Sequence, residues 1–441
     1  MTTNREMKYS GNPWIGEIPK EWNMKRLKDV GLLYGGLTGK AGDDFIAEDD
    51  ESCAYMRFIP FTNIFNNTII NPNQLYKVRI EEGEKQNLVN KNDILFLMSS
   101  EDYDGVGKPA ILEEQIDNLS LNSFCKGFRV TDTDTHPKYL LYLLLSHVIR
   151  ELVRQEAKGF IRINLRQDKL SNCPIMLPPI IEQQKIATFL DRKSSEIDEM
   201  ITLQEKIIDE LKAYKQSVIT KAVTKGLDPN VPMKDSGIDW IGEIPEHWET
   251  TKFKALFQIK KIIAGKLGYD VLSVTQQGLR VKDLSKNEGQ VAQDYSKYQL
   301  VDIDDFVMNH MDLLTGYIDC AKVLGVTSPD YRTFINRNQT IAYNPYYLRI
   351  FQKCYKDKTF YHLGQGVSFL GRWRLPKEQL NAFVLPLPSL DEQKVIANYI
   401  DTKCTEIDNL ISIKLSKIDS LKEYKKSIIY EYVTGKKEVT E

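Results

Sequence analysis

The sequence predicts a mixed α/β protein built as an internal repeat, in which two long helices alternate with two unlike inserts. Two observations support this prediction. The phrase MKYSGNPWIGEIPKEW (7–22) returns as MKDSGIDWIGEIPEHW (233–248), with 11 of 16 residues identical without a gap. Later, LPPIIEQQKIATFLDRKSSEID (177–198) returns as LPSLDEQKVIANYIDTKCTEID (387–408). A duplicated frame with twofold-like symmetry explains both matches better than a repeated surface turn does.

Length and composition narrow the class of protein. A chain of 441 residues has room for about two to four domains, each with its own core. The six cysteines stand apart without a CxxC pair, which favours reduced thiols and a cytoplasmic protein. No apolar run approaches the roughly 20 residues of a membrane span, so no membrane partner is expected. The net charge is −2, so any polyanion partner would have to meet local basic patches.

The repeated phrases divide the chain into six segments. Trp14, Trp22, Trp240 and Trp248 recur in the two copies of the first phrase, which favours a framework role in anchoring each insert against the helices. The offset between the copies falls from 226 residues in the first phrase to 210 in the second, so the segment between the two phrases is 16 residues longer in the first half of the chain. The predicted segments are an N-terminal framework arm (1–22), a first insert (23–176), a central long helix (177–226), a linker with the repeated arm (227–249), a second insert (250–384) and a distal long helix with a C-terminal tail (385–441).

The two inserts look unrelated in sequence, and both have mixed α/β patterns. The short runs DILFLM (93–98), FCKGFRV (124–130) and DDFVMN (304–309) lie between turn-forming residues and predict strands. The run PKYLLYLLLSHVIRELVRQ (137–155) predicts a helix.

The late phrases predict two long helices with a heptad seam, because apolar residues recur at alternating steps of four and three. Prolines at 178, 179, 386 and 388 precede the helices, and 181–224 alone would span about 65 Å. Gln204 and Lys414, and likewise Lys215 and Lys425, interrupt the seam at matching places and could fix its register. Two separate helices, each packed on its own domain, remain the alternative. The predicted seam residues are Ile197, Ile201, Ile208, Leu211 and Val218 in the first helix, and Ile407, Ile411, Ile418, Leu421 and Ile428 in the second.

A search for catalytic motifs finds none that is complete. NPYY (344–347) lacks the second proline of an adenine-methyltransferase motif, and we interpret it as a turn leading into YLRIF. YGGLTGKAG (34–42) has the wrong glycine spacing for a phosphate-binding loop, and we interpret it as a flexible polar loop. Among the histidines, His310 at the end of a predicted strand is the one to test, and its alternative is an ordinary hydrogen-bonded role. We therefore predict a non-catalytic chain that binds no metal or cofactor.

The layout resembles the specificity subunit of type I restriction–modification systems over essentially the whole chain. The resemblance rests on the tandem organisation, the helix openings of the form EQxxIAxxLD, the helix ends of the form LKxYKxSxI and the repeated WIGEIPxxW. Within the inserts, KNDILFL and DIDDFVMN resemble a strand of the family's recognition domains. GFIRINLRQDKL and GQGVSFLGRWRLPKEQL resemble the loop before the closing strand of those domains.

The resemblance implies two target recognition domains separated by two long antiparallel coiled-coil helices. Each recognition domain would read one half of a split, asymmetric sequence in double-stranded DNA. The helix pair would set the half-site spacing and dock two methyltransferase subunits, and two restriction/translocase subunits would join through that core. S-adenosylmethionine, ATP and magnesium are expected on those partners, which would carry out adenine-N6 methylation and ATP-dependent cleavage.

Recognition of DNA without catalysis needs cations for phosphates and Arg, Asn or Gln for base edges. The candidates cluster in five stretches, two of which lie at equivalent places near the ends of the two inserts. The alternative is that they are solvated surface residues or pack on the helices. The candidates are Arg57, Asn63, Arg162, Asn164, Arg166 and Lys169 in the first insert, and Gln276, Arg280, Arg332, Arg337, Arg372, Arg374 and Lys377 in the second.

Two other functions remain open from the sequence. The chain could be the recognition part of a fused restriction–methyltransferase, although it lacks the motifs that such an enzyme needs. It could also be a two-domain scaffold that binds proteins and not DNA.

Overall fold

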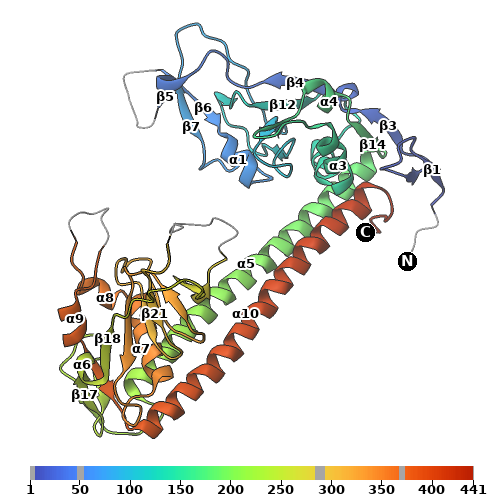
Figure 1. Cartoon of the computed structure of the whole chain (residues 1–441). Coiled ribbons are helices and arrows are strands. Elements are labelled where there is room, and N and C mark those ends of the chain that lie inside the picture. The colour runs from blue at the N-terminus through green and yellow to red at the C-terminus, as the bar shows by residue number, and fades with distance from the viewer. Residues whose placement is uncertain (1–4, 47–53, 284–293, 367–372, 441) are drawn as a thin grey trace. The chain divides into compact units, whose positions relative to one another are not determined.

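The computed structural model describes residues 5–46, 54–283, 294–366 and 373–440. The chain forms two compact units (Figure 1): unit 1 comprises Met1–Gln204 and Ser416–Glu441, and unit 2 comprises Glu205–Leu415. Each unit contains one arm, one insert, the start of one long helix and the end of the other. The fold is mixed α/β, as the sequence predicts.

The two long helices are α5 (Ile180–Lys225), with 46 residues, and α10 (Leu390–Val433), with 44. In unit 1, Ala187 near the start of α5 shares a hydrophobic core with Val433 at the end of α10. In unit 2, Val223 near the end of α5 shares a core with Ala397 near the start of α10. The helices are therefore antiparallel in both units, as the resemblance implies.

Two of the four polar interruptions of the seam, Lys215 and Lys425, form equivalent ion pairs. In unit 1, Lys425 Nζ lies 2.7 Å from Asp198 Oδ2, and in unit 2 Lys215 Nζ lies 2.7 Å from Asp408 Oδ2. These residues are equivalent in the repeat, with the roles of the two helices exchanged. Each lysine thus meets a carboxylate across the seam, which gives the antiparallel register a charged marker.

The predicted seam positions lie on the inward side of both helices. Most of the residues beside them are exposed, as a heptad pattern requires. Of the predicted set, Ile197, Ile208, Val218, Ile407, Ile418 and Ile428 are buried, and Ile201, Leu211, Ile411 and Leu421 are half-buried.

The insert of unit 1 holds two four-stranded sheets in its described part, with orders β10-β8-β12-β4 and β11-β6-β7-β5. The strands of the first sheet are antiparallel, and β11 pairs parallel with β6 in the second. The strands are β4 (Gly31–Gly35), β5 (Phe45–Ile46), β6 (Tyr55–Ile59), β7 (Tyr76–Arg79), β8 (Ile94–Leu97), β10 (Pro109–Ile111), β11 (Leu119–Leu121) and β12 (Cys125–Val130). The helices are η1 (Leu27–Asp29), η2 (Gly42–Asp44), α1 (Phe61–Asn66), α2 (Pro137–Leu145), α3 (His147–Glu156) and α4 (Gln167–Ser171).

The described part of the second insert also has two four-stranded sheets, with orders β18-β25-β22-β23 and β20-β19-β24-β21. The strands are β18 (Phe257–Lys260), β19 (Val271–Thr275), β20 (Gly278–Val281), β21 (Gln299–Val301), β22 (Phe306–Met308), β23 (Ile318–Cys320), β24 (Gly325–Thr327) and β25 (Arg332–Asn336). The helices are α6 (Phe253–Leu256), α7 (Asn344–Lys356), α8 (Thr359–His362) and α9 (Lys377–Ala382).

The inserts share a topology although their sequences look unrelated. One sheet of each insert has a matching strand order, β4-β12-β8-β10 in unit 1 and β18-β25-β22-β23 in unit 2. In both sheets, the strand that comes first in the sequence lies at one edge. In each second sheet, a hairpin (β6–β7 or β19–β20) pairs in parallel with a later strand, β11 or β24. The second sheets differ at the outer strand: β5 lies beside β7 in unit 1, and β21 lies beside β24 in unit 2.

Five further short antiparallel pairs lie in the described arms, within the first insert, and where each insert joins the frame. These are β1 (Met7–Tyr9) with β2 (Glu17–Pro19), β3 (Asn23–Arg26) with β14 (Pro174–Leu177), β9 (Ser99–Ser100) with β13 (Ile163–Asn164), β15 (Met233–Asp235) with β16 (Glu243–Pro245), and β17 (Glu249–Lys252) with β26 (Val384–Leu387). The strands β3 and β17 enter the inserts, and β14 and β26 leave them, so each insert is closed where it joins the frame.

One tryptophan of each arm lies where the two long helices meet. Trp22 is fully buried, and its Nε1 donates a 3.2 Å hydrogen bond to Glu182 Oε2 at the start of α5. A side chain added at Gly435, just after α10, would lie 3.2 Å from the Trp22 ring. In unit 2, Trp248 Nε1 donates to Glu392 Oε1 at the start of α10, also at 3.2 Å.

The other two tryptophans differ from each other. Trp240 is half-buried and stacks on Phe383 with ring centroids 5.1 Å apart. Trp14 is 53% exposed. The framework role predicted for all four tryptophans therefore fits Trp14 poorly, because an anchor residue needs a packed environment.

One predicted helix is wrong in its continuity. The run 137–155 forms two helices, α2 and α3, because Ser146 between them has extended backbone angles of φ −61° and ψ 144°. The Ser146 Oγ donates to Leu143 O at 2.6 Å, and its carbonyl accepts the N–H of Arg150, so one residue closes α2 and opens α3. No helix in the described ranges combines the length and hydropathy of a membrane span.

Candidate nucleic-acid interface

In unit 2, the loop that follows β22 brings three distant parts of the insert together. The N–H of Leu375 donates to His310 O at 2.9 Å, and the N–H of Leu313 donates to Trp373 O at 3.2 Å. Gln276 Nε2, at the tip of the β19–β20 hairpin, donates to Thr315 O at 3.4 Å. The loop 309–315 is therefore bonded both to the hairpin and to the segment before α9.

Two of the predicted arginines lie at this loop. Arg332 is half-buried at the start of β25, and its Nη1 donates to Leu375 O at 3.0 Å. Arg374 is exposed, and its backbone pairs with Gln365. The charges of both guanidinium groups act on His310, so His310 lies in one cluster with two positively charged side chains.

His310 stays neutral in this cluster. Burial, reinforced by the nearby charges of Arg332 and Arg374, lowers the pKa of His310 to about 4. Its buried Nδ1 has no hydrogen-bond partner among the described residues. The ordinary hydrogen-bonded role that was the alternative for His310 therefore does not describe this nitrogen. A neutral imidazole beside two arginines can donate or accept a hydrogen bond.

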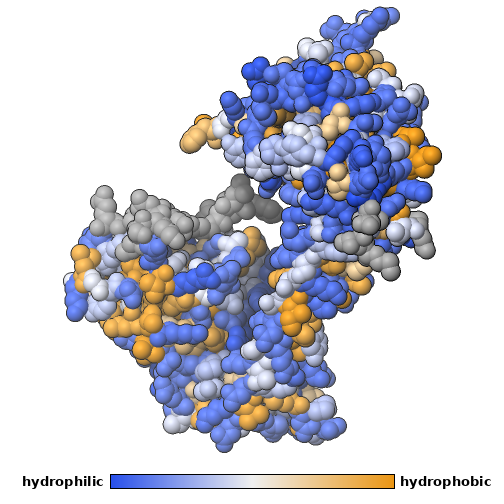
Figure 2. All heavy atoms as spheres, turned by 90° about the vertical axis from the view of Figure 1, so that its right-hand side faces the viewer, coloured by the Kyte–Doolittle hydropathy of each residue, from blue (hydrophilic) through white to orange (hydrophobic). Residues whose placement is uncertain are grey.

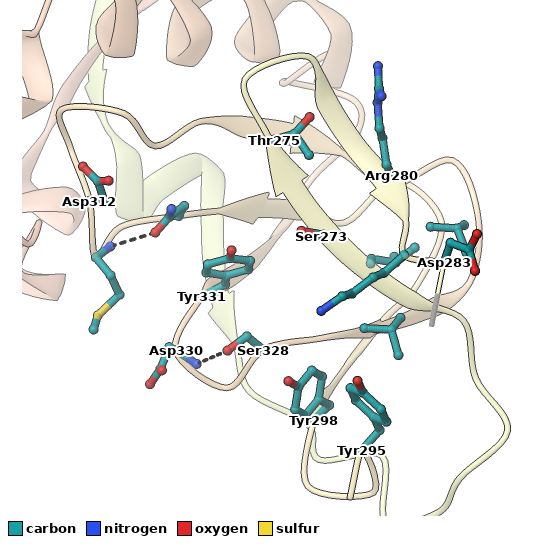
Figure 3. Close-up of a pocket in the computed structure, with 16 residues that line it drawn as sticks. Ser273, Thr275, Arg280, Asp283, Tyr295, Tyr298, Asp312, Ser328, Asp330 and Tyr331 are labelled. Carbon is teal, nitrogen blue, oxygen red and sulfur yellow. Dashed lines mark hydrogen bonds between the residues drawn. The ribbon is translucent and has the colours of Figure 1, made fainter. Parts of the chain in front are cut away.

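A cleft of about 680 Å³ lies between the β19–β20 hairpin and the loops 309–312 and 328–331. Its lining includes Ser273, Arg280, Tyr298 and Asp312. Figure 3 shows Arg280 extending from the hairpin away from Tyr295 and Tyr298, which lie at the opposite end of the cleft. The Arg280 guanidinium donates to Gln277 Oε1, which ties it to the turn of the hairpin.

Unit 1 has the same construction with different side chains. The N–H of Leu165 donates to Met98 O at 2.8 Å, so Met98 occupies the place that His310 has in unit 2. The short pair β9–β13 sets Asn164 opposite Ser99. Arg162 is exposed and lies over the ring of Phe124, with Cζ 5.1 Å from the centroid. Arg162 and Asn164 are thus brought together at the edge of this unit.

The other two cations of this stretch have acidic partners within unit 1. Arg166 Nε lies 2.9 Å from Asp168 Oδ1, and Lys169 Nζ lies 2.6 Å from Glu156 Oε2. All four side chains are substantially exposed, so these pairs contribute little to stability, and a phosphate could compete for the cations.

The prediction that Asn63 reads a base is wrong for this structure. Asn63 is fully buried in α1, and its Nδ2 donates to Asn71 O and Gln74 O, each at 2.9 Å. Its Oδ1 accepts the N–H of Asn71 at 3.0 Å. The amide therefore closes the loop after α1, and its hydrogen-bonding groups face inward. Arg57 is exposed on β6 and donates to Asp117 O at 3.2 Å.

Arg337 does not join the cluster of unit 2. It follows the end of β25, where its N–H donates to Leu256 O at 2.8 Å and its Nε donates to Phe257 O at 3.3 Å. Arg332 is the first residue of the same strand and Arg337 follows its last, so the length of β25 separates the two arginines. Lys377 is exposed at the start of α9. Arg372 lies outside the described residues.

Sequence reasoning missed two aromatic residues, Phe124 and Tyr361, that pack against the basic stretches. Phe124 lies under Arg162, and Tyr361 stacks on Trp373 with centroids 5.4 Å apart. The Trp373 Nε1 also donates to Tyr361 O at 2.6 Å. An available signal was the interleaving of aromatic and basic residues, although Phe124 lies far from Arg162 in the sequence.

The motifs that resembled catalytic ones have structural roles. NPYY is helical: it forms the start of α7, where Tyr346 and Tyr347 are buried. Its interpretation as a turn before a following element is therefore wrong. Their hydroxyls donate to Val223 O at 3.0 Å and Pro386 O at 3.2 Å. In the glycine-rich stretch, Lys40 Nζ pairs with Glu84 Oε2 at 2.6 Å. Within the described ranges, no three His, Cys, Asp or Glu side chains gather as a metal site would require.

Comparison with known proteins gives one consistent result. A family model described as the type I restriction modification DNA specificity domain matches residues 19–213 and again 245–423. Two proteins of Methanocaldococcus jannaschii that carry the name type I restriction enzyme specificity subunit, MjaX and MjaVIII, are each 28% identical. The alignments cover 96% and 95% of this chain, and 95% and 93% of those proteins.

Solved structures share the fold. A chain from a structural study of complex assembly and conformational transition in the type I R-M system matches with a TM-score of 0.69 and 13% identity, covering 95% of this chain and 99% of that one. The crystal structure of the HsdS subunit from Thermoanaerobacter tengcongensis matches with a TM-score of 0.53 and 14% identity, covering 95% and 98%.

Proposed function

The chain belongs to the family of type I restriction modification DNA specificity domains, and from that premise we propose that each of its inserts reads one half of a bipartite, asymmetric DNA site. The chain itself would be non-catalytic. Methylation of adenine at N6 and ATP-dependent cleavage would be carried out by partner subunits, which would hold S-adenosylmethionine, ATP and magnesium.

The observation that carries this proposal is that Met98 and His310 occupy equivalent positions in the two inserts but have different side chains and surroundings. The same backbone hydrogen bond holds Met98 in unit 1 and His310 in unit 2. Around His310 lie Arg332 and Arg374, whereas Ser99 and Asn164 lie beside Met98. Two copies of one scaffold that present different hydrogen-bonding groups suit two unlike half-sites, since identical copies would suit a palindrome.

Arg374→Ala is expected to weaken specific DNA binding by about 1–3 kcal/mol if the guanidinium reads a guanine. Arg337→Ala is the matched control, because this second arginine of the same insert lies at the other end of β25 and is expected to leave affinity unchanged. The measurement is a gel shift with the chain assembled with its methyltransferase subunits. The duplex would contain the motif that methylation sequencing maps in cells carrying the system.

Equal affinities for Arg374→Ala and the parent complex would remove Arg374 from the interface. Failure of the parent complex to retain any one bipartite sequence over competitor DNA would contradict the proposed function itself. That second result would favour a scaffold that binds proteins only.

We further propose that the helix pair docks two methyltransferase subunits. Large apolar side chains are exposed on both long helices, off the seam, at positions that are equivalent in the repeat. Figure 2 shows hydrophobic residues at the surface of the helix pair among hydrophilic ones. Because the set occurs twice, it suits two copies of one partner. The equivalent pairs are Met200 and Leu410, Leu203 and Ile413, and Tyr214 and Tyr424.

Leu203→Lys and Ile413→Lys are each expected to remove one methyltransferase subunit, and the double variant is expected to remove both. A lysine keeps the helix but places a charge where an apolar contact would form. Native mass spectrometry of the assembled complex measures the stoichiometry. Ile181→Lys is the control, since Ile181 is an exposed apolar residue of α5 whose equivalent is Asp391. A full complement of subunits on the double variant would rule out this surface.

A further inference from the structure

The turn 159–162 of unit 1 exposes two large apolar side chains next to each other. Phe160 is 100% exposed and Ile161 is 87% exposed. Scattered exposed hydrophobic residues are common, but an adjacent pair with almost no packing marks a surface that awaits a partner.

The backbone holds this pair in place. Lys158 and Asn164 exchange two backbone hydrogen bonds of 2.9 Å, which close the turn as a tight hairpin. Asn164 Nδ2 donates to Arg162 O at 3.0 Å. Gly159 has φ +152°, and a Cβ there would lie 1.9 Å from Arg162 O, so the turn requires glycine. Phe160 and Ile161 are therefore presented by a fixed projection.

The surroundings of the pair are cationic. Lys158 and Arg162 flank it and are both exposed. The Arg162 guanidinium lies over the ring of Phe124 in a cation–π contact. An apolar tip between two cations is complementary to DNA, which offers phosphates on the outside and stacked apolar base faces inside. A purely apolar protein surface would leave both cations without a counter-charge.

We infer that Phe160 and Ile161 form a wedge that enters the base stack of the half-site read by the first insert. The inference rests on the proposed function and adds how that half-site is deformed. Apolar side chains inserted between base pairs partly unstack one step and kink the duplex by about 20–90°. Because pyrimidine–purine steps unstack most easily, the wedge adds selectivity at a step that no polar group contacts. In sequence, the second insert has Phe369 and Leu370 in the corresponding stretch, outside the described residues.

The test uses the chain assembled with its methyltransferase subunits and duplexes that contain the motif mapped by methylation sequencing. A 2-aminopurine base is placed at successive positions through both half-sites. Besides the rise at any adenine that a methyltransferase subunit flips out of the stack, fluorescence is expected to rise on binding of the parent complex at one step of one half-site, where the base loses its neighbour. Phe160→Ala is expected to abolish that rise and to lower affinity about tenfold. Phe160→Leu, which keeps an apolar wedge, is expected to retain part of both.

Leu32→Ala is the matched control, because Leu32 is 66% exposed in the same unit but lies on β4, outside the turn. It is expected to bind and unstack DNA as the parent does. Unchanged affinity and fluorescence in the double variant, Phe160→Ala with Ile161→Ala, would overturn the wedge. The proposed function would still stand. Loss of a methyltransferase subunit from the Phe160→Ala complex would also overturn it, by assigning the turn to a protein interface. A parent complex that retains no specific duplex would instead refute the proposed function.

Discussion

Trp248→Ala is expected to lower the free energy of unfolding of unit 2 by about 3–5 kcal/mol, and Trp22→Ala to do the same in unit 1. Each ring is almost fully buried in the main core of its unit, so truncation removes a large apolar surface and leaves a cavity. Each indole N–H also donates to a glutamate at the start of a long helix, Glu392 or Glu182. The substitution therefore also leaves that carboxylate without one of its donors.

Trp14→Ala is the control for both, since it comes from the same repeated motif but is half exposed. Its expected effect is within about 0.5 kcal/mol, as for other surface substitutions. Because a chain of two units need not unfold in one step, hydrogen exchange measured by mass spectrometry on peptides of each unit is the suitable readout. Equal protection in Trp248→Ala and Trp14→Ala would show that the buried ring does not hold the frame together.

Insertion of one heptad in each long helix, after Ile208 in α5 and after Ile418 in α10, is expected to lengthen the recognised spacer by about three base pairs. Seven residues add about 10.5 Å of helix, and a base pair rises about 3.4 Å. The two sites are equivalent in the repeat and both isoleucines are buried. A heptad in each helix preserves the seam and lets the ion pairs Lys425–Asp198 and Lys215–Asp408 form as before.

The same insertion in α5 alone is the control. It makes α5 one heptad longer than its partner stretch of α10, so the apolar contacts and the inter-helix ion pairs cannot form in both units at once. Methylation is therefore expected to be lost. Methylation sequencing of cells that carry each variant measures the outcome. A matched double insertion that still methylates the original motif would contradict the role of the helices in setting the spacing.

The long helices were predictable from the sequence almost to the residue. The range predicted as helical, 181–224, became α5 at Ile180–Lys225. Proline before the helix and a period of seven within it are local signals, and a helix is made from local hydrogen bonds. The failure at 137–155 has the opposite cause. Its apolar residues pack into the core both before and after Ser146, so the apolar pattern does not show the break. The break arises because the Ser146 hydroxyl bonds to Leu143 O in α2 and the Ser146 carbonyl accepts the N–H of Arg150 in α3.

The candidate site was predictable in composition but not in arrangement. Arg332 and Arg337 are five residues apart in sequence, yet the strand between them puts them at opposite ends of β25. Asn63 looked like a base reader and instead holds the chain that follows α1. A polar side chain can be buried when it finds hydrogen-bond partners, as Asn63 does in the carbonyls of Asn71 and Gln74. The sequence alone does not indicate that these groups meet.

The sequence alone established the duplicated frame, the two long helices and their seam, because repetition and heptad periodicity are written in consecutive residues. It could not establish that one four-stranded sheet has the same strand order in the two unlike inserts, or that Met98 and His310 hold the same place. Those relations arise from strand pairing and packing between segments far apart in the chain. Many different sequences satisfy the same pattern of backbone hydrogen bonds and buried apolar faces, so only the folded structure reveals the equivalence.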